Sequence, residues 1–168
     1  MKMKRIMLAT AALWAIAHTV ACAETIQIGD GTSNTAYVPT YGWFDYSWSD
    51  SIYLKEEIGD TCVITGLSYY VTNEPYEYTM SNQRIFLLET NRASFDAAAY
   101  EDPAVSGAAA VFDGTVTWNG SGWHSIPFDT PFDFSGEANL VIHWENRDGS
   151  WGYGYPGHFR GHTLDLAF

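Results

Sequence analysis

Two short clusters of aromatic residues are the part of this sequence best suited to binding chemistry. Residues 43–48 read WFDYSW and are set among Gly and Ser, and residues 151–156 read WGYGYP. Such small neighbours leave the rings with few side chains to bury them. Exposed rings stack on the C–H faces of a pyranose. The clusters therefore predict glycan contact by six residues: Trp43, Tyr46, Trp48, Trp151, Tyr153 and Tyr155.

Polar residues lie near both clusters and could hydrogen-bond sugar hydroxyls. They are Asp45, Asp50, Asn146 and Asp148. The alternative interpretation is that the two clusters pack on each other or under a loop. In that case the aromatics stabilise the fold and bind no ligand.

Two turn sequences offer oxygen ligands of the kind that calcium prefers. Residues 30–32 (DGT) and 146–149 (NRDG) supply carboxylate, amide and carbonyl oxygens, with Asp30, Asn146 and Asp148 as the predicted ligands. Neither turn matches the twelve-residue EF-hand loop, and Asx-Gly turns also arise for backbone reasons alone. Calcium is the single cofactor that the sequence suggests.

Motifs for catalysis are missing. The sequence contains no G-x-S-x-G elbow, no H-E-x-x-H and no phosphate-cradling Gly-rich loop. Several carboxylates could still pair at the separation that glycosidases use. They are Glu56, Glu57, Asp129, Asp133 and Glu145. We therefore expect a protein that is not an enzyme, with a small glycoside-active enzyme as the more distant alternative.

The first 23 residues are expected to be a secretory signal peptide. Lys2, Lys4 and Arg5 form a positive start, residues 6–17 are apolar but too few to span a bilayer, and residues 21–23 (ACA) suit signal peptidase. A lipoprotein anchored through Cys22 is the weaker alternative. The prediction is a secreted or cell-surface protein with no membrane span after cleavage.

Residues 24–168 are long enough for one domain with its own core. The formal net charge is −12, and the three basic residues of the leader make the mature domain more acidic still. Binding to nucleic acid requires a basic patch that neutralises phosphates, so nucleic acid is excluded as a partner. An extracellular glycan or a surface protein is the expected partner. Cys62 is left without a second cysteine and is expected to be a buried, structural thiol.

The domain that positions these residues is predicted to be all-β. Runs rich in Val, Ile, Thr and aromatics alternate with Gly, Asn, Asp and Pro. The predicted strands are 25–28, 36–41, 51–54, 62–72, 83–89, 109–118, 122–128, 138–144 and 162–168. The strands at 83–89 and 138–144 are the most apolar and are expected to be central. This spacing is typical of a two-sheet antiparallel β-sandwich, either a jelly roll or immunoglobulin-like.

One short helix is expected near residues 94–101, where Ser94 could cap the run and Pro103 would end it. Pro131 is expected on an edge strand or at the start of a strand, since it cannot donate to a neighbour. Five aromatics are expected in the core. They are Phe86, Phe112, Trp123, Phe132 and Trp144.

A series of phrases in this order resembles a known module. They are IGDGTS (28–33), VPTY (38–41), IYLKEEIG (52–59), ITGLSYY (64–70), QRIFL (83–87), TNRASF (90–95), VFDGTV (111–116), GWHSI (122–126), FDTPF (128–132) and GEANLVI (136–142). The chain is similar to β-sandwich (jelly-roll or Ig-like) accessory modules of secreted and surface bacterial proteins, notably Bacteroidetes-type adhesins and proteases. The resemblance implies an accessory role and no catalytic residues. Such modules usually stand in long multidomain chains.

The sequence as a whole predicts a non-catalytic extracellular binding or adhesion module that contacts carbohydrate through exposed aromatics. The alternative is a structural spacer domain from a larger, truncated surface protein, with all of its aromatics buried.

Overall fold

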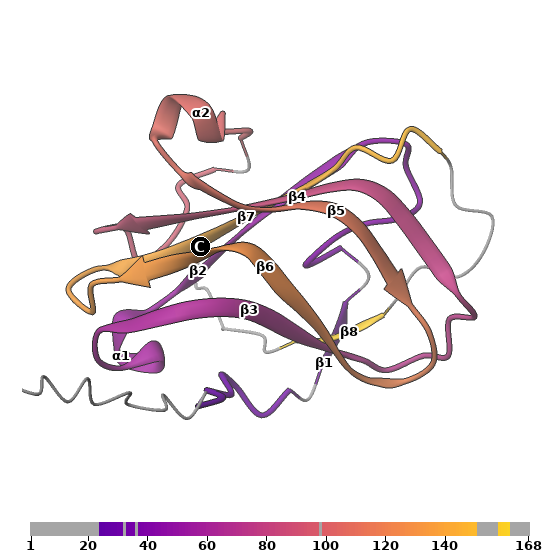
Figure 1. Cartoon of the computed structure of the whole chain (residues 1–168), viewed down its shortest axis with the longest axis horizontal. Helices are drawn as coiled ribbons and strands as arrows, with labels where there is room; N and C mark the ends of the chain where they lie inside the picture. Colours follow the sequence, from indigo (N-terminus) through magenta and orange to yellow (C-terminus); the bar gives the residue numbers. More distant parts are fainter. Residues whose placement is uncertain (1–23, 32, 36, 98, 151–157, 162–168) are drawn as a thin grey trace, which may run out of the picture.

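The computed structural model describes residues 24–31, 33–35, 37–97, 99–150 and 158–161, and these form two four-stranded antiparallel sheets (Figure 1). In chain order the elements are β1 (Ser33–Thr35), β2 (Ser47–Tyr53), α1 (Lys55–Ile58), β3 (Cys62–Val71), β4 (Tyr78–Thr90), α2 (Pro103–Ser106), β5 (Ala109–Trp118), β6 (Gly122–Phe134), β7 (Asn139–Asn146) and β8 (Phe159–Gly161). The predicted all-β, two-sheet sandwich is confirmed.

The first sheet has the strand order β1-β8-β3-β6, and the second sheet has the order β2-β7-β4-β5. The consecutive strands β5 and β6 belong to different sheets, so the turn between them carries the chain from one layer to the other. Figure 1 shows α2 standing out from the second sheet, on the side away from β3 and β6. The second sheet therefore has an outer face that a connecting segment partly covers.

The core lies between the sheets and is built from alternate residues of the strands. In β7, Leu140, Ile142 and Trp144 are buried members of the core. Trp118 is fully buried at the end of β5 and stacks on Trp144 with ring centroids 6.3 Å apart. By the same alternation, the intervening residues of β7 face outward, and these include His143.

Most of the predicted strands are present. The strand 109–118 matches β5, and β4 and β7 are central in their sheet as expected. β6 is an edge strand of the first sheet, which explains how it accommodates Pro131. Residues 25–28 are not in a strand, nor are the described residues of 36–41. The predicted strand 162–168 lies outside the described residues.

The helix predicted near 94–101 is not found among the described residues of that range. The helical turn begins later, at Pro103, and Asp102 is its N-cap, accepting a hydrogen bond from the Ala104 amide at 2.9 Å. Proline has no amide hydrogen and a fixed φ, so it suits the first position of a helix. Pro103 therefore starts the helix that it was expected to end.

Two of the five predicted core aromatics lie elsewhere. Trp123 is 56 % exposed, because it faces outward on the first sheet, where it meets Tyr70 edge-on at 5.6 Å. Arg160 covers the same tyrosine ring, with its guanidinium carbon 3.9 Å from the centroid. Phe86 is half-buried on the outer face of the second sheet. Trp144 is in the core as predicted. Phe112 and Phe132 are partly exposed and pack against the core.

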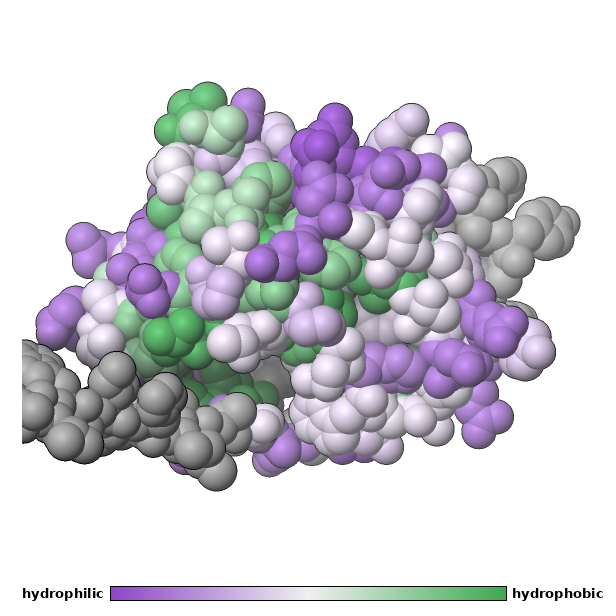
Figure 2. Space-filling view, in the orientation of Figure 1, coloured by the Kyte–Doolittle hydropathy of each residue, from purple (hydrophilic) through white to green (hydrophobic). Residues whose placement is uncertain are grey.

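Polar and apolar surface are unevenly distributed over the molecule. Figure 2 shows hydrophobic residues gathered around α2 and the layer beneath it, with hydrophilic residues bordering them and scattered over the rest of this face. Cys62 is half-buried at the start of β3, where it packs against the core, and burial raises the pKa of its thiol. No helix among the described residues is long and apolar enough to cross a membrane.

Candidate functional site

The outer face of the second sheet carries two parallel rows of side chains. The pairing of the strands sets their composition, since residues directly opposite each other share a face. In the order β2, β7, β4, the rows are Trp48–Glu145–Arg84 and Asp50–His143–Phe86. Strand pairing thus collects acids, a histidine, an arginine and aromatic rings from three distant parts of the chain.

The connection from β4 to β5 passes over these rows, and we call its described residues, 91–97 and 99–108, the crossing segment. Arg92 and Glu101 form an ion pair at its base, in which the two terminal guanidinium nitrogens of Arg92 donate to the carboxylate at 2.6 and 2.7 Å. Tyr100 reaches from the segment to β7 and donates its hydroxyl to Glu145 Oε1 at 2.7 Å. This bond ties the segment to the sheet.

A pocket of about 550 Å³ lies between the crossing segment and the outer face. Its lining combines four aromatic rings with four charged side chains. The rings are Tyr46, Trp48, Phe86 and Tyr100, and the charged groups are Arg84, Asp102, Glu145 and Arg147. Trp48 is 39 % exposed and Tyr100 is 50 % exposed, so both rings have free surface. The pocket has the composition of a site for a ligand with both apolar faces and hydrogen-bonding groups.

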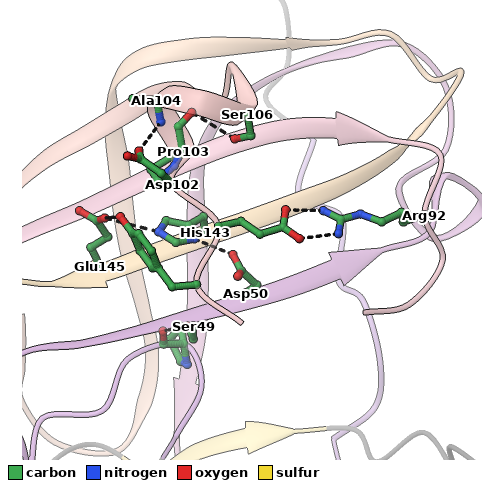
Figure 3. A network of polar contacts seen from close by, with 12 residues as sticks. Ser49, Asp50, Arg92, Asp102, Pro103, Ala104, Ser106, His143 and Glu145 are labelled. Carbon is green, nitrogen blue, oxygen red and sulfur yellow. Dashed lines mark hydrogen bonds and ion pairs between the residues drawn. The ribbon is translucent and has the colours of Figure 1, made fainter. Parts of the chain in front are cut away.

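His143 lies behind the pocket wall and is only 4 % exposed. Its Nδ1 is 2.6 Å from Asp50 Oδ1, and its Nε2 is 3.6 Å from Glu145 Oε1. Figure 3 shows His143 between these two carboxylates. The Trp48 ring is nearly parallel to the imidazole at 6.4 Å, and Tyr100 meets it edge-on at 5.7 Å. The cluster therefore supports the Trp48 and Tyr100 rings of the pocket from behind.

The charges around this cluster shift two pKa values upward. Burial by itself lowers the pKa of His143, but the hydrogen bond and charge of Asp50, together with Glu145, outweigh it and raise the value above 6.5. The hydrogen bond to Glu145, with burial and the negative charge of that carboxylate, raises the pKa of Tyr100 to about 12. Tyr100 therefore stays protonated as a hydrogen-bond donor at any physiological pH.

A buried polar network holds the 39–46 loop beside the pocket. Gln83 is fully buried, and its amide nitrogen donates to Asn146 Oδ1 at 2.6 Å while its oxygen accepts from the Trp144 indole at 2.9 Å. The Asn146 amide nitrogen in turn donates to the Phe44 carbonyl at 3.1 Å. Gly149 also donates to the backbone of this loop, at Asp45. The network positions the predicted aromatic cluster against the end of the sheet.

The aromatic residues predicted to contact a glycan divide into two groups. Trp43, Tyr46 and Trp48 are exposed, and Tyr46 and Trp48 both line the pocket. Trp43 and Tyr46 also border a shallower hollow of about 320 Å³, together with Phe44 and Asp45. The remaining three, Trp151, Tyr153 and Tyr155, lie outside the described residues.

The predicted calcium ligands are engaged with protein groups. Asp148 accepts hydrogen bonds from the backbone and hydroxyl of Ser81 and from Ser150, and the Asn146 oxygen accepts from Gln83. Asp30 precedes Gly31, which packs on Arg160 in the first sheet. Among the described residues, no group of three or more His, Cys, Asp or Glu is arranged to hold a metal ion. Calcium binding stays a prediction.

The site contains four residues that the sequence did not predict to belong to it. His143, Arg84, Phe86 and Tyr100 belong to it only because of strand register and the path of the crossing segment. The alternation along β7 does indicate that His143 and Glu145 share one face. Nothing local in the sequence indicates which residues of β2 and β4 lie opposite them.

In comparisons with known proteins, no protein-family model, no curated protein and no solved structure matches the chain.

Proposed function

We propose that this domain is a non-catalytic extracellular module that binds carbohydrate in the pocket between the crossing segment and the outer face of the second sheet. The observation that carries the proposal is the pairing of exposed rings with charged groups around one hollow. Trp48 and Tyr100 meet at 5.7 Å, and Glu145 lies beside both.

The geometry of the two rings suits a sugar. Trp48 comes from a strand and Tyr100 from the crossing segment, and their planes are inclined at 68°. A pyranose can place a C–H face on one ring while its edge meets the other. Sugar binding of this kind needs rigid aromatics rather than a deep cavity, because hydroxyl groups remain partly in water.

Hydrogen-bonding groups are available around the rings. Arg84 uses its Nε to pair with Asp113 at 2.9 Å, and within the described part of the chain its terminal nitrogens make no hydrogen bond. Arg147 reaches Glu145 at 3.8 Å, from a side chain that is half exposed. Both guanidinium groups can therefore donate to ligand hydroxyls at the rim.

The proposal predicts that the protein is retained by at least one insoluble polysaccharide from a panel of cellulose, chitin, xylan and β-1,3-glucan. Trp48→Ala removes the ring from the strand and is expected to weaken retention about tenfold or more, since stacked aromatics dominate such contacts. Trp123→Ala is the matched control, because it removes an exposed tryptophan from the other sheet and is expected to change retention less than twofold.

Three results would contradict the proposal. Failure of every polysaccharide to retain the protein would favour the structural spacer. Equal losses for Trp48→Ala and Trp123→Ala would place binding elsewhere. Release of reducing sugar from the panel would identify an enzyme, with Glu145 as the first carboxylate to replace.

A further inference from the structure

His143 is enclosed by rings and carboxylates behind the wall of the candidate binding pocket. Trp48, Phe86 and Tyr100 surround the imidazole with centroid distances of 6.4, 5.9 and 5.7 Å. The side chain is 5 % exposed. Water therefore does not solvate its ring nitrogens, and their partners must come from the protein.

Both ring nitrogens face hydrogen-bond acceptors. Nδ1 is paired with Asp50, while Nε2 is buried, makes no hydrogen bond to any of the described residues and lies 3.6 Å from the Glu145 carboxylate. A neutral imidazole has one donor and one acceptor, so with Nδ1–H donated to Asp50 its Nε2 lone pair would point toward a negative oxygen. Only the protonated ring presents a donor on both sides.

Charged groups of every neighbouring element act on this ring. β2 contributes Asp50, and β7 contributes Glu145 with Arg147 at 3.8 Å from it. β4 contributes the uncharged Phe86, which lies opposite His143. Arg84, also on β4, lies one row away and is paired with Asp113 of β5.

The crossing segment adds four further groups. Tyr100 donates to Glu145, the charge of Glu101 is coupled to that of His143, and Arg92 forms the ion pair with Glu101. Asp102 acts on Tyr100 and caps α2. Acidic groups dominate the immediate surroundings of the ring, so the balance of charge favours its cationic form.

Glu145 connects the histidine to the pocket wall. Its Oε1 atom is the acceptor for the Tyr100 hydroxyl and also the atom nearest to His143 Nε2. While the imidazole is protonated, its charge holds Glu145 in place and Glu145 holds Tyr100 against Trp48. Loss of that proton leaves a lone pair facing the same oxygen, which repels the carboxylate and loosens Tyr100.

We propose that protonation of His143 fixes the Trp48–Tyr100 wall of the pocket, so that ligand binding at this site is strongest in mildly acidic solution and weakens as the ring loses its proton at higher pH. This inference rests on the proposed function for its consequence in binding, but the movement of the wall can be measured without any ligand. Because the pKa of His143 is raised, the stabilised form is complete below about pH 6.5 and is lost as the pH rises through the folded-state value.

The first experiment measures the wall directly, by acrylamide quenching of tryptophan fluorescence between pH 5 and 9. The contribution of Trp48 is the difference between the wild type and Trp48→Phe, with Trp123→Phe as the matched control. Quenching of Trp48 is expected to increase about twofold with a midpoint above 6.5, and that of Trp123 to stay constant. The increase should disappear in His143→Gln, which donates to Asp50 but does not titrate.

A second variant covers the case in which His143→Gln does not fold. Asp50→Asn removes the charge that holds the proton on the ring, so the quenching midpoint is expected to move to lower pH by one unit or more. Quenching of Trp48 that is independent of pH in the wild type would overturn the inference. A pH dependence that survives in His143→Gln, or a midpoint unmoved in Asp50→Asn, would overturn it equally.

The second experiment tests whether protonation of His143 affects glycan binding. Retention on the cellulose, chitin, xylan and β-1,3-glucan panel is compared at pH 5.5 and pH 8.0, with at least a threefold loss expected at the higher pH and none in His143→Gln. Equal retention at both pH values overturns the regulation and leaves the binding site intact. If nothing is retained at either pH, the proposed function fails, and the quenching result decides by itself whether His143 controls the wall.

Discussion

Buried polar side chains specify much of this fold at the scale of single residues. Gln83 is fully buried in β4 and connects three parts of the chain, because it contacts Thr40, Trp144 and Asn146. A buried amide of this kind is costly unless all of its groups are paired. Here the hydrogen bonds of Gln83 and Asn146 fix the 39–46 loop, and this loop places Tyr46 at one rim of the pocket.

Replacing Gln83 should therefore destabilise the protein strongly. Gln83→Leu keeps the volume but leaves the indole of Trp144 without its partner and removes one of the two hydrogen bonds to the Asn146 oxygen, so we expect a loss of about 2–4 kcal/mol in the free energy of unfolding. Urea denaturation measures it. Gln27→Leu replaces an exposed glutamine and should change stability by less than about 0.5 kcal/mol. A similar small loss for both variants would show that the network contributes little.

The sequence predicts the exposure of some aromatic side chains correctly and of others wrongly. Trp43, Tyr46 and Trp48 are exposed as predicted, the first two from a loop and Trp48 from the outer face of β2. Trp123 was expected in the core, yet its strand places it on the outer face. One position along a strand decides between interior and exterior, and residue type alone does not fix that position.

At the scale of elements, close approach of two strands is set by a glycine. Gly66 lies at an irregularity in the pairing of β3 with β6, and a β-carbon there would be 2.7 Å from the Ile126 carbonyl oxygen. Backbone atoms cannot yield as a flexible side chain can. The first sheet therefore depends on the absence of a side chain at this position.

Gly66→Ala is expected to force β3 and β6 apart locally and to cost about 1–3 kcal/mol in unfolding free energy. Thermal and urea denaturation should both detect the loss. Ser68→Ala, two residues along the same strand and exposed, is the control and should cost under about 0.5 kcal/mol. An alanine variant as stable as the wild type would mean that the strands separate here without penalty.

Elements were predictable from sequence where they are long and periodic. β3, β4, β5 and β7 follow apolar runs that end at turn residues, which is the pattern that long-range pairing selects. β1 has only three residues and pairs with β8 from the far end of the chain, so local pattern does not reveal it. The helix predicted near residues 94–101 is misplaced because a proline can either end a helix or stand at its first position, and Pro103 does the latter.

At the scale of the whole molecule, the two sheets present different outer faces. The first sheet exposes Trp123 beside Tyr70 and Arg160, without a segment over it that contacts these rings in the described residues. The second sheet carries the crossing segment, the pocket and the buried histidine. We therefore expect ligand contact on the second sheet, where rings and hydrogen-bonding groups converge.

The sequence predicts only part of the candidate site. Its residues come from β2, β4, β7 and the crossing segment, and they meet because of sheet order and register. The Trp43–Trp48 cluster marked one side of the pocket. His143 and Tyr100 could not be paired with it before the strands were aligned.

The most direct test of glycan binding in this pocket is a ¹H–¹⁵N NMR titration of the protein with an oligosaccharide released from whichever polysaccharide retains it. The account predicts that the Trp48 indole and the backbone amides of Tyr100, Glu145 and Arg147 shift first and saturate together, while the Trp123 indole stays in place. Shifts confined to Trp123 and Tyr70, or no shift in any residue, would contradict it.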